Sequence, residues 1–158
     1  MTIDKADWHW NSAEKLYRET YGIIGELTET QEDEIWSLSA NHIGLFLRWI
    51  IENGMECDDA DKENCEKVRN GQMSGTEYLF SNCDGKFWGS DIKEDLLPFI
   101  EYYYISNDYY EDYIECCTND YDKQCFGVVS IEDDYLKLRE KINEKYKDFL
   151  KKSEIYKV

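Results

Sequence analysis

The sequence is poor in proline, with one proline in 158 residues, and it has no run of apolar residues long enough to cross a bilayer. It has no proline-rich, glycine-rich or repeated stretch, so it offers no flexible linker and no low-complexity segment. The first residues, with Asp4, Lys5 and Asp7 around Trp8, lack the apolar stretch of a secretory signal peptide. We therefore expect a cytoplasmic protein.

Motifs of common enzymes and metal sites are missing as well. There is no Gly-x-Ser-x-Gly, no glycine-rich phosphate loop before a helix, no His-Glu-x-x-His and no Cys-x-x-Cys. The acidic residues 58–63 lack the glycine and the terminal acid of an EF-hand loop. The cysteines, expected to be reduced thiols, are not spaced as zinc ligands. They are Cys57, Cys65, Cys83, Cys116, Cys117 and Cys125. We predict no enzyme, no cofactor and no metal site.

Basic residues are scarce, since 18 lysines and arginines stand against 35 aspartates and glutamates, a formal net charge of −17. Residues 56–134 hold 21 acids and 6 bases, whereas residues 135–158 hold 4 acids and 8 bases. A field of this strength attracts a cationic partner and repels nucleic acid and anionic membrane. We therefore expect a basic protein as the partner, with no direct contact to nucleic acid or membrane.

Tyrosines are mixed with the acids, and residues 102–113 include six of them. Because tyrosine is a favoured anchor at binding surfaces, we predict an acidic, tyrosine-rich docking surface. Its predicted residues are Asp58, Asp59, Asp61, Glu63, Asp108, Tyr109, Tyr110, Glu111, Asp112, Tyr113, Asp120 and Asp122. The tyrosines could equally pack in the core at helical spacing, and the sequence leaves both interpretations open.

The hydrophobic content of the chain and the spacing of its apolar residues favour a folded, mainly helical protein. Hydrophobic residues make up 42% and aromatic residues 15% of the chain, which separates it from disordered acidic tails. A strong apolar repeat predicts a central core helix that begins at Ser39 or Asn41 and ends at Asn53 and Gly54. We expect one compact domain over residues 1–158, α-helical with at most a small sheet.

Caps, turn residues and periodicity predict the remaining elements. The first expected helix begins at Asn11 or Ser12 and ends at Gly22, and a second covers 61–70. A third begins at the capping box of Ser74 and Glu77, and a fourth begins at Asn107 and covers 109–117. The last covers about 131–152, with Ser130 as its cap. Residues 28–34 are either a loop or an exposed first helical turn. Pro98 lies in the first turn of a helix or kinks one. The best strand candidates are 125–129 and 21–24, and the basic last helix is expected to pack on the acidic middle.

Both histidines lie near predicted helix starts, His9 after Trp8 and His42 at the start of the core helix. Such a histidine more often caps a helix or makes a buried hydrogen bond than acts as a general base. A catalytic histidine would need an orienting carboxylate, for which the candidates are Asp4, Asp7 and Glu52. A small-ligand pocket is an alternative, lined by Trp8, His9, His42 and Trp49.

Two tryptophan-bearing stretches carry a resemblance to a known family. The first is Asp7, Trp8, His9 and Trp10, and the second is His42, Ile43, Gly44, Leu45, Phe46, Leu47, Arg48 and Trp49. With residues 74–79, 82–86, 102–113 and 128–135, they resemble an uncharacterised bacterial domain family of small acidic proteins. That family is similar in character to immunity proteins, which neutralise toxins delivered by rival cells.

The resulting hypothesis is an immunity protein that binds a basic toxin domain. A toxin that attacks nucleic acid needs a basic groove, which carboxylates can occupy after fast electrostatic capture. Two alternatives remain open. One is an acidic regulator or nucleic-acid mimic that binds another basic protein, and the other is an enzyme or small-ligand binder that uses the pocket of tryptophans and histidines.

Overall fold

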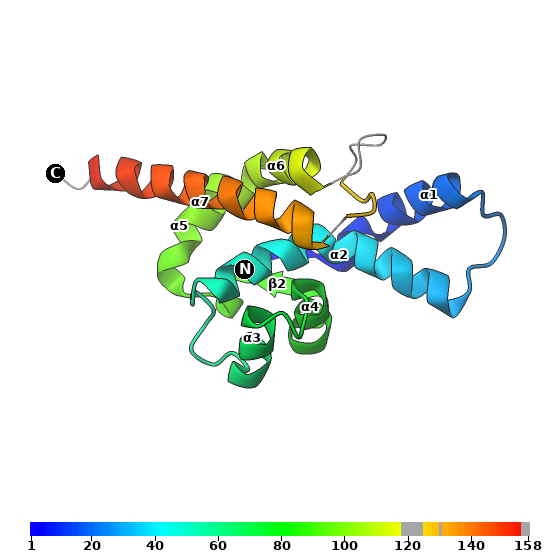
Figure 1. Ribbon diagram of the computed structural model, residues 1–158, viewed down its shortest axis with the longest axis horizontal. Helices are drawn as coiled ribbons and strands as arrows, with labels where there is room; N and C mark the ends of the chain where they lie inside the picture. The colour runs from blue at the N-terminus through cyan, green and yellow to red at the C-terminus, as the bar shows by residue number, and fades with distance from the viewer. Residues whose placement is uncertain (118–124, 130, 156–158) are drawn as a thin grey trace. The chain divides into compact units, whose positions relative to one another are not determined.

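The fold comes from a computed structural model, which describes residues 1–117, 125–129 and 131–155 (Figure 1). Helices make up most of the described residues, and a two-stranded sheet accompanies them. The prediction of a mainly α-helical protein with a small sheet is therefore confirmed. The chain divides into two compact units, Met1–Glu94 and Asp95–Val158. The predicted single domain over residues 1–158 stays a prediction.

The centre of the first unit is helix α2 (Glu29–Glu52). Its capping box joins the Thr28 and Gln31 side chains to each other's backbone N–H groups. The predicted start at Ser39 or Asn41 is wrong, because the helix begins earlier, at Glu29. Residues 29–34, for which the sequence allowed a loop or an exposed first helical turn, are the largely exposed start of this helix. From residue 39 to residue 47 every side chain of α2 is buried, so this stretch forms the core of the unit.

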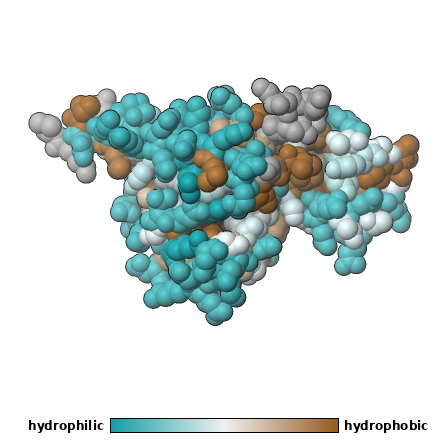
Figure 2. Space-filling model, viewed as in Figure 1, coloured by the Kyte–Doolittle hydropathy of each residue, from teal (hydrophilic) through white to brown (hydrophobic). Residues whose placement is uncertain are grey.

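Helix α1 (Trp10–Tyr21) packs against α2 and ends at Gly22, as predicted. It begins before the predicted caps Asn11 and Ser12, with His9 at the N-cap position. The strand predicted over 21–24 is wrong, since Tyr21 closes the helix and a loop follows. Figure 2 shows an apolar patch on this loop, where Ile24 is 99% exposed.

Helix α4 (Gly75–Cys83) begins at the predicted capping box of Ser74, and helix α3 (Lys62–Arg69) lies within the helix predicted over 61–70, with Asp61 as its N-cap. Helix α4 packs on α2 at a point where two glycines meet. A Cβ atom on Gly75 would lie 1.8 Å from the Gly44 carbonyl oxygen, so the two backbones are in direct contact. This contact fixes α4 against the buried stretch of α2.

Strand β1 (Thr2–Lys5) pairs antiparallel with β2 (Lys86–Trp88), and a bulge interrupts the register between Thr2 and Asp4. A short 3-10 helix, η1 (Ala6–His9), follows β1 and leads into α1. The strand predicted over 125–129 is wrong, because these residues form a turn and irregular backbone. A second short 3-10 helix, η2 (Gly89–Asp91), follows β2.

The second unit is helical and its core is rich in tyrosine. Tyr103, Tyr109, Tyr113 and Tyr135 are fully buried there. Pro98 lies in the first turn of a helix, the first of the two predicted alternatives. The basic last helix packs on the helix before it, and its predicted cap Ser130 lies outside the described residues. The elements from the boundary between the units onward are η3 (Glu94–Leu96), α5 (Leu97–Phe99), the π-helical η4 (Ile100–Ile105), α6 (Asp108–Cys117) and α7 (Ile131–Ile155).

Candidate functional site

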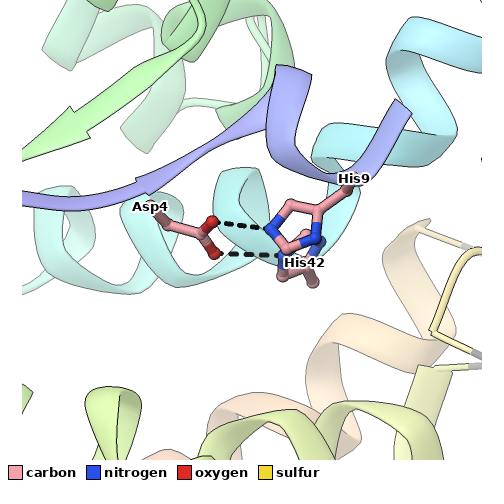
Figure 3. A group of neighbouring side chains, drawn as sticks. All are labelled: Asp4, His9 and His42. Atoms are coloured by element: carbon pink, nitrogen blue, oxygen red, sulfur yellow. Dashed lines mark hydrogen bonds and ion pairs between the residues drawn. The ribbon is translucent and has the colours of Figure 1, made fainter. Parts of the chain in front are cut away.

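The Asp4 carboxylate faces the imidazole rings of both His9 and His42, with one ring at each of its oxygens (Figure 3). Nε2 of His9 is 2.6 Å from Oδ1 of Asp4, and Nε2 of His42 is 3.2 Å from Oδ2. The two rings meet edge to face, with centroids 4.6 Å apart. Both histidines that the sequence singled out are thus brought to one carboxylate, which was one of the three candidate partners.

The bulge in β1 explains why Asp4 points inward. In a regular strand neighbouring side chains alternate between the two faces, but Ile3 and Asp4 are both buried here. A bulge lets two successive residues oppose one partner residue and re-aims a side chain. The backbone N–H of Lys5 donates to Oδ1 of Asp4 at 2.8 Å, which fixes the carboxylate further.

Burial decreases from His42 to His9. The side chain of His42 is 0% exposed, that of Asp4 is 8% and that of His9 is 19%. His42 is held on the rigid buried stretch of α2, whereas His9 ends η1 at the edge of the cluster. Solvent therefore reaches this Asp4–His9–His42 cluster from the His9 side.

The two imidazoles control the charge of the carboxylate. Burial alone would raise the pKa of Asp4, but the hydrogen bonds and charges of His42 and His9 outweigh burial and hold that pKa well below its usual range. Burial lowers the pKa of His42, and its contact with Asp4 opposes this shift. The cluster therefore keeps an anionic carboxylate in a largely buried place.

Three potential metal ligands converge in this cluster, since one ligand atom from each residue lies within 4.8 Å of the other two. Imidazole nitrogens and a carboxylate oxygen are donors that zinc and related divalent ions accept. The sequence prediction of no metal site rested on spacing along the chain. His9 and His42 lie 5 and 38 residues from Asp4, so no local motif shows that the three residues meet.

The predicted pocket of Trp8, His9, His42 and Trp49 is not formed as expected. Trp49 is buried and packs on Phe46 in the core, with ring centroids 5.7 Å apart. Trp8 is 58% exposed and lies under the Lys5 ammonium group. The structure thus brings the two histidines together but places the two tryptophans in different environments, one exposed and one in the core.

A groove of about 510 Å³ lies in the first unit on a different set of residues. Trp36 and Phe80 supply its aromatic surface, and both signs of charge surround them. The sequence did not indicate it, because its walls come from four separate segments. They are Lys5, Ala6, Asp7, Asp33, Trp36, Ser37, Phe80, Asp84, Gly85 and Lys86.

The predicted docking carboxylates differ in exposure and in contacts. The exposed ones are Asp58, Asp59, Asp61, Glu63, Asp108 and Glu111. Asp61 and Asp112 have structural contacts, because Asp61 accepts from the Asn64 backbone at the start of α3 and Asp112 accepts from the Tyr103 hydroxyl at 2.7 Å. Asp120 and Asp122 lie outside the described residues.

The tyrosines of the predicted surface are mostly core residues, which corrects their assignment. Tyr109 is 1% and Tyr113 is 0% exposed, so neither can anchor a partner on this surface. Tyr110 is half-buried beside Phe126. The sequence prediction also missed Glu115, which is exposed one helical turn after Glu111 on the same face of α6.

Comparison with known proteins identifies a family. A family model described as "Domain of unknown function (DUF7832)" matches residues 2–128, a range that includes Asp4, His9 and His42. No curated protein and no solved structure matches the chain. Within the described residues, no helix combines the length and the apolar character that crossing a membrane requires.

Proposed function

Since this chain belongs to the DUF7832 family, whose description assigns no function, we propose a function from its charge and its exposed side chains. We propose that it binds a basic protein through exposed carboxylates and acts as a cytoplasmic immunity protein against a toxin domain. The observation that carries the proposal is the net charge of −17, together with the exposure of the carboxylates on both units.

On the first unit, the acidic surface lies at the start of α3. Asp58 and Asp59 are exposed in the loop before the helix, and Glu63 is exposed in its first turn. Glu63 also forms an ion pair with Lys67 at 3.3 Å, so part of its charge is compensated within the helix. Asp58 and Asp59 are therefore the stronger candidates for contact with a partner.

On the second unit, the acidic surface lies on α6. Asp108, Glu111 and Glu115 are exposed along it. Burial raises the pKa of the Cys116 thiol on α6, and the positive charges of Lys137 and Lys141 on α7 oppose this shift. These two lysines therefore lie close to α6. The basic residues of α7 thus relieve repulsion within the unit, while the net charge of the protein stays strongly negative.

A basic toxin domain suits this surface for a kinetic reason. Complementary charge raises the rate of encounter by ~10- to 1000-fold at low salt, which favours capture before the toxin meets its substrate. Carboxylates can also occupy a groove that binds phosphate groups. The tyrosines contribute mainly to the core beneath the surface, so recognition depends on the acids.

A pull-down with the protein encoded immediately upstream tests the proposal. We expect a basic protein that is retained at low salt, is released as salt rises, and is toxic to cells unless this chain is co-expressed. Capture of a basic regulator without toxicity would favour the alternative of a nucleic-acid mimic. A neutral or acidic neighbour with no affinity would count against both.

A further inference from the structure

We propose that Asp4, His9 and His42 form a binding site for a zinc-type divalent cation. The proposal is independent of the acidic docking surface and concerns a different part of the first unit. The donor set is two imidazole nitrogens and one carboxylate oxygen, which zinc accepts and which calcium and magnesium, as oxygen-seeking ions, do not prefer.

The spacing of the three residues fits a metal ion after small side-chain movements. Ligand atoms around a tetrahedral zinc ion, at bond lengths of about 2.0–2.2 Å, lie about 3.3–3.6 Å from one another. The potential ligand atoms of the cluster all lie within 4.8 Å of one another. Binding would require the imidazole nitrogens to turn from the carboxylate to the ion, without movement of the backbone.

The backbone already holds the three residues in place. Asp4 sits at the bulge of β1, where the Lys5 N–H group fixes its carboxylate, and His42 sits on the fully buried stretch of α2. His9 joins them from η1, so three separate elements converge on one point (Figure 3). Ligands placed on regular elements are held more precisely than ligands on loops.

The solvent access of the cluster favours an open site rather than a closed structural one. Three protein ligands leave a fourth position of a tetrahedral ion for water or for a bound molecule. The His9 side chain is 19% exposed, whereas that of His42 is 0% exposed, so the open position would lie on the His9 side. The alternative is a hydrogen-bonded network only, in which the histidines do no more than hold a buried carboxylate.

A calorimetric titration of Zn²⁺ into the untagged protein, freed of metal with a chelator, tests the proposal. We expect one ion per chain, with affinity at least tenfold weaker in His9→Gln. Asp7→Asn is the matched control, because Asp7 is an exposed acid on the same short helix, and it should bind as the wild type does. Equal affinity in the wild type and His9→Gln would overturn the proposal.

Two spectroscopic measurements locate the ion without any variant. The chain has two histidines, so long-range ¹H–¹⁵N spectra contain two imidazole rings, and one equivalent of Zn²⁺ should shift the nitrogens of both. With Co²⁺, the visible bands should appear without an intense thiolate-to-metal band. If the imidazole signals do not move, the three residues form a hydrogen-bonded network only. If a thiolate-to-metal band appears, the ion is bound by cysteines. Either result would reject the proposed site.

Discussion

Asp4 shows how a single buried charge is accommodated in this protein. An unpaired carboxylate in the interior would cost several kcal/mol, on the order of 3 or more, so buried acids are paired and hydrogen-bonded. Asp4 has an imidazole on each oxygen and a backbone N–H group on Oδ1. The carboxylate in turn ties β1 and η1 to α2.

Replacement of Asp4 by alanine should therefore lower the free energy of unfolding by about 3 kcal/mol, because His42 would lose its buried partner. Urea denaturation in the presence of a chelator measures this change. Asp7→Ala, an exposed acid on the next element, should stay within about 0.5 kcal/mol of the wild type. If the two variants are equally stable, the cluster does not hold the first unit together.

Sequence reasoning reached part of this cluster. It named His9 and His42 and included Asp4 among three candidate carboxylates. It could not choose among them, because the inward turn of Asp4 depends on a bulge opposite β2, more than 80 residues away along the chain. It also grouped Trp8 and Trp49 with the histidines, although one is exposed and the other belongs to the core.

At the scale of elements, local chemistry predicted helices well and strands poorly. The caps at Asp61 and Ser74 and the helix end at Gly22 are signals carried by a few adjacent residues. The sheet joins residues 2–5 to residues 86–88, and a strand of three residues has no periodicity to detect. The two predicted strands were chosen for composition alone, and among the described residues neither segment forms a strand.

The contact between α2 and α4 should be intolerant of a single methyl group. Gly44→Ala would place a Cβ atom 2.4 Å from the Thr76 hydroxyl oxygen and 2.5 Å from its backbone nitrogen, so the helices would have to separate. We expect a loss of about 3 kcal/mol in the free energy of unfolding, measured by urea denaturation.

Gly54→Ala provides the matched control for that variant. Gly54 has a positive φ of +65°, but nothing lies within 4 Å of its Cβ position, so only backbone strain of about 1 kcal/mol is expected. A Gly44→Ala protein that is as stable as Gly54→Ala would show that the helices do not approach as closely as described.

The tyrosine core of α6 and η4 should be visible in an alkaline titration. Burial raises the pKa of Tyr103, Tyr109 and Tyr113 well above the usual value of about 10. These groups therefore stabilise the fold fully below pH ~10, and that contribution is lost as the pH rises above it, because the unfolded chain releases the protons first.

Near-ultraviolet absorbance of tyrosinate measures this effect. In the native protein part of the tyrosine signal should stay absent above pH ~10 and appear together with unfolding, whereas in denaturant all tyrosines should titrate as one group near pH ~10. Complete titration of the native protein near pH ~10 with the fold intact would mean that these tyrosines are on the surface after all.

At the scale of the whole molecule, the distribution of charge along the chain could be predicted from the sequence. Which of the predicted surface residues are exposed could not. The number of acids predicts an anionic surface with few assumptions, since charged side chains are seldom buried. Which residues can contact a partner depends on packing. The structure moves Tyr109 and Tyr113 into the core, gives Asp61 and Asp112 structural contacts, and adds Glu115 to the exposed face of α6.

Two double charge reversals compare the acidic face of α6 with an equal change elsewhere. Glu111→Lys with Glu115→Lys alters exposed acids four residues apart on α6, and Glu140→Lys with Glu144→Lys does the same on the basic helix α7. Both change the net charge by the same amount, so a difference between them reports position. Ile24→Ser tests the exposed apolar loop as a competing contact.

The most direct test of the acidic docking surface is the association rate constant of these variants with the basic partner captured in the pull-down, measured by stopped flow at low and high salt. We predict that the α6 double reversal slows association at least tenfold at low salt. The α7 double reversal and Ile24→Ser should have much smaller effects. The differences among the variants should shrink near ~1 M salt, because the Debye length there is about 3 Å. Association that is unchanged by the α6 reversal, or that is lost in Ile24→Ser, would contradict the account.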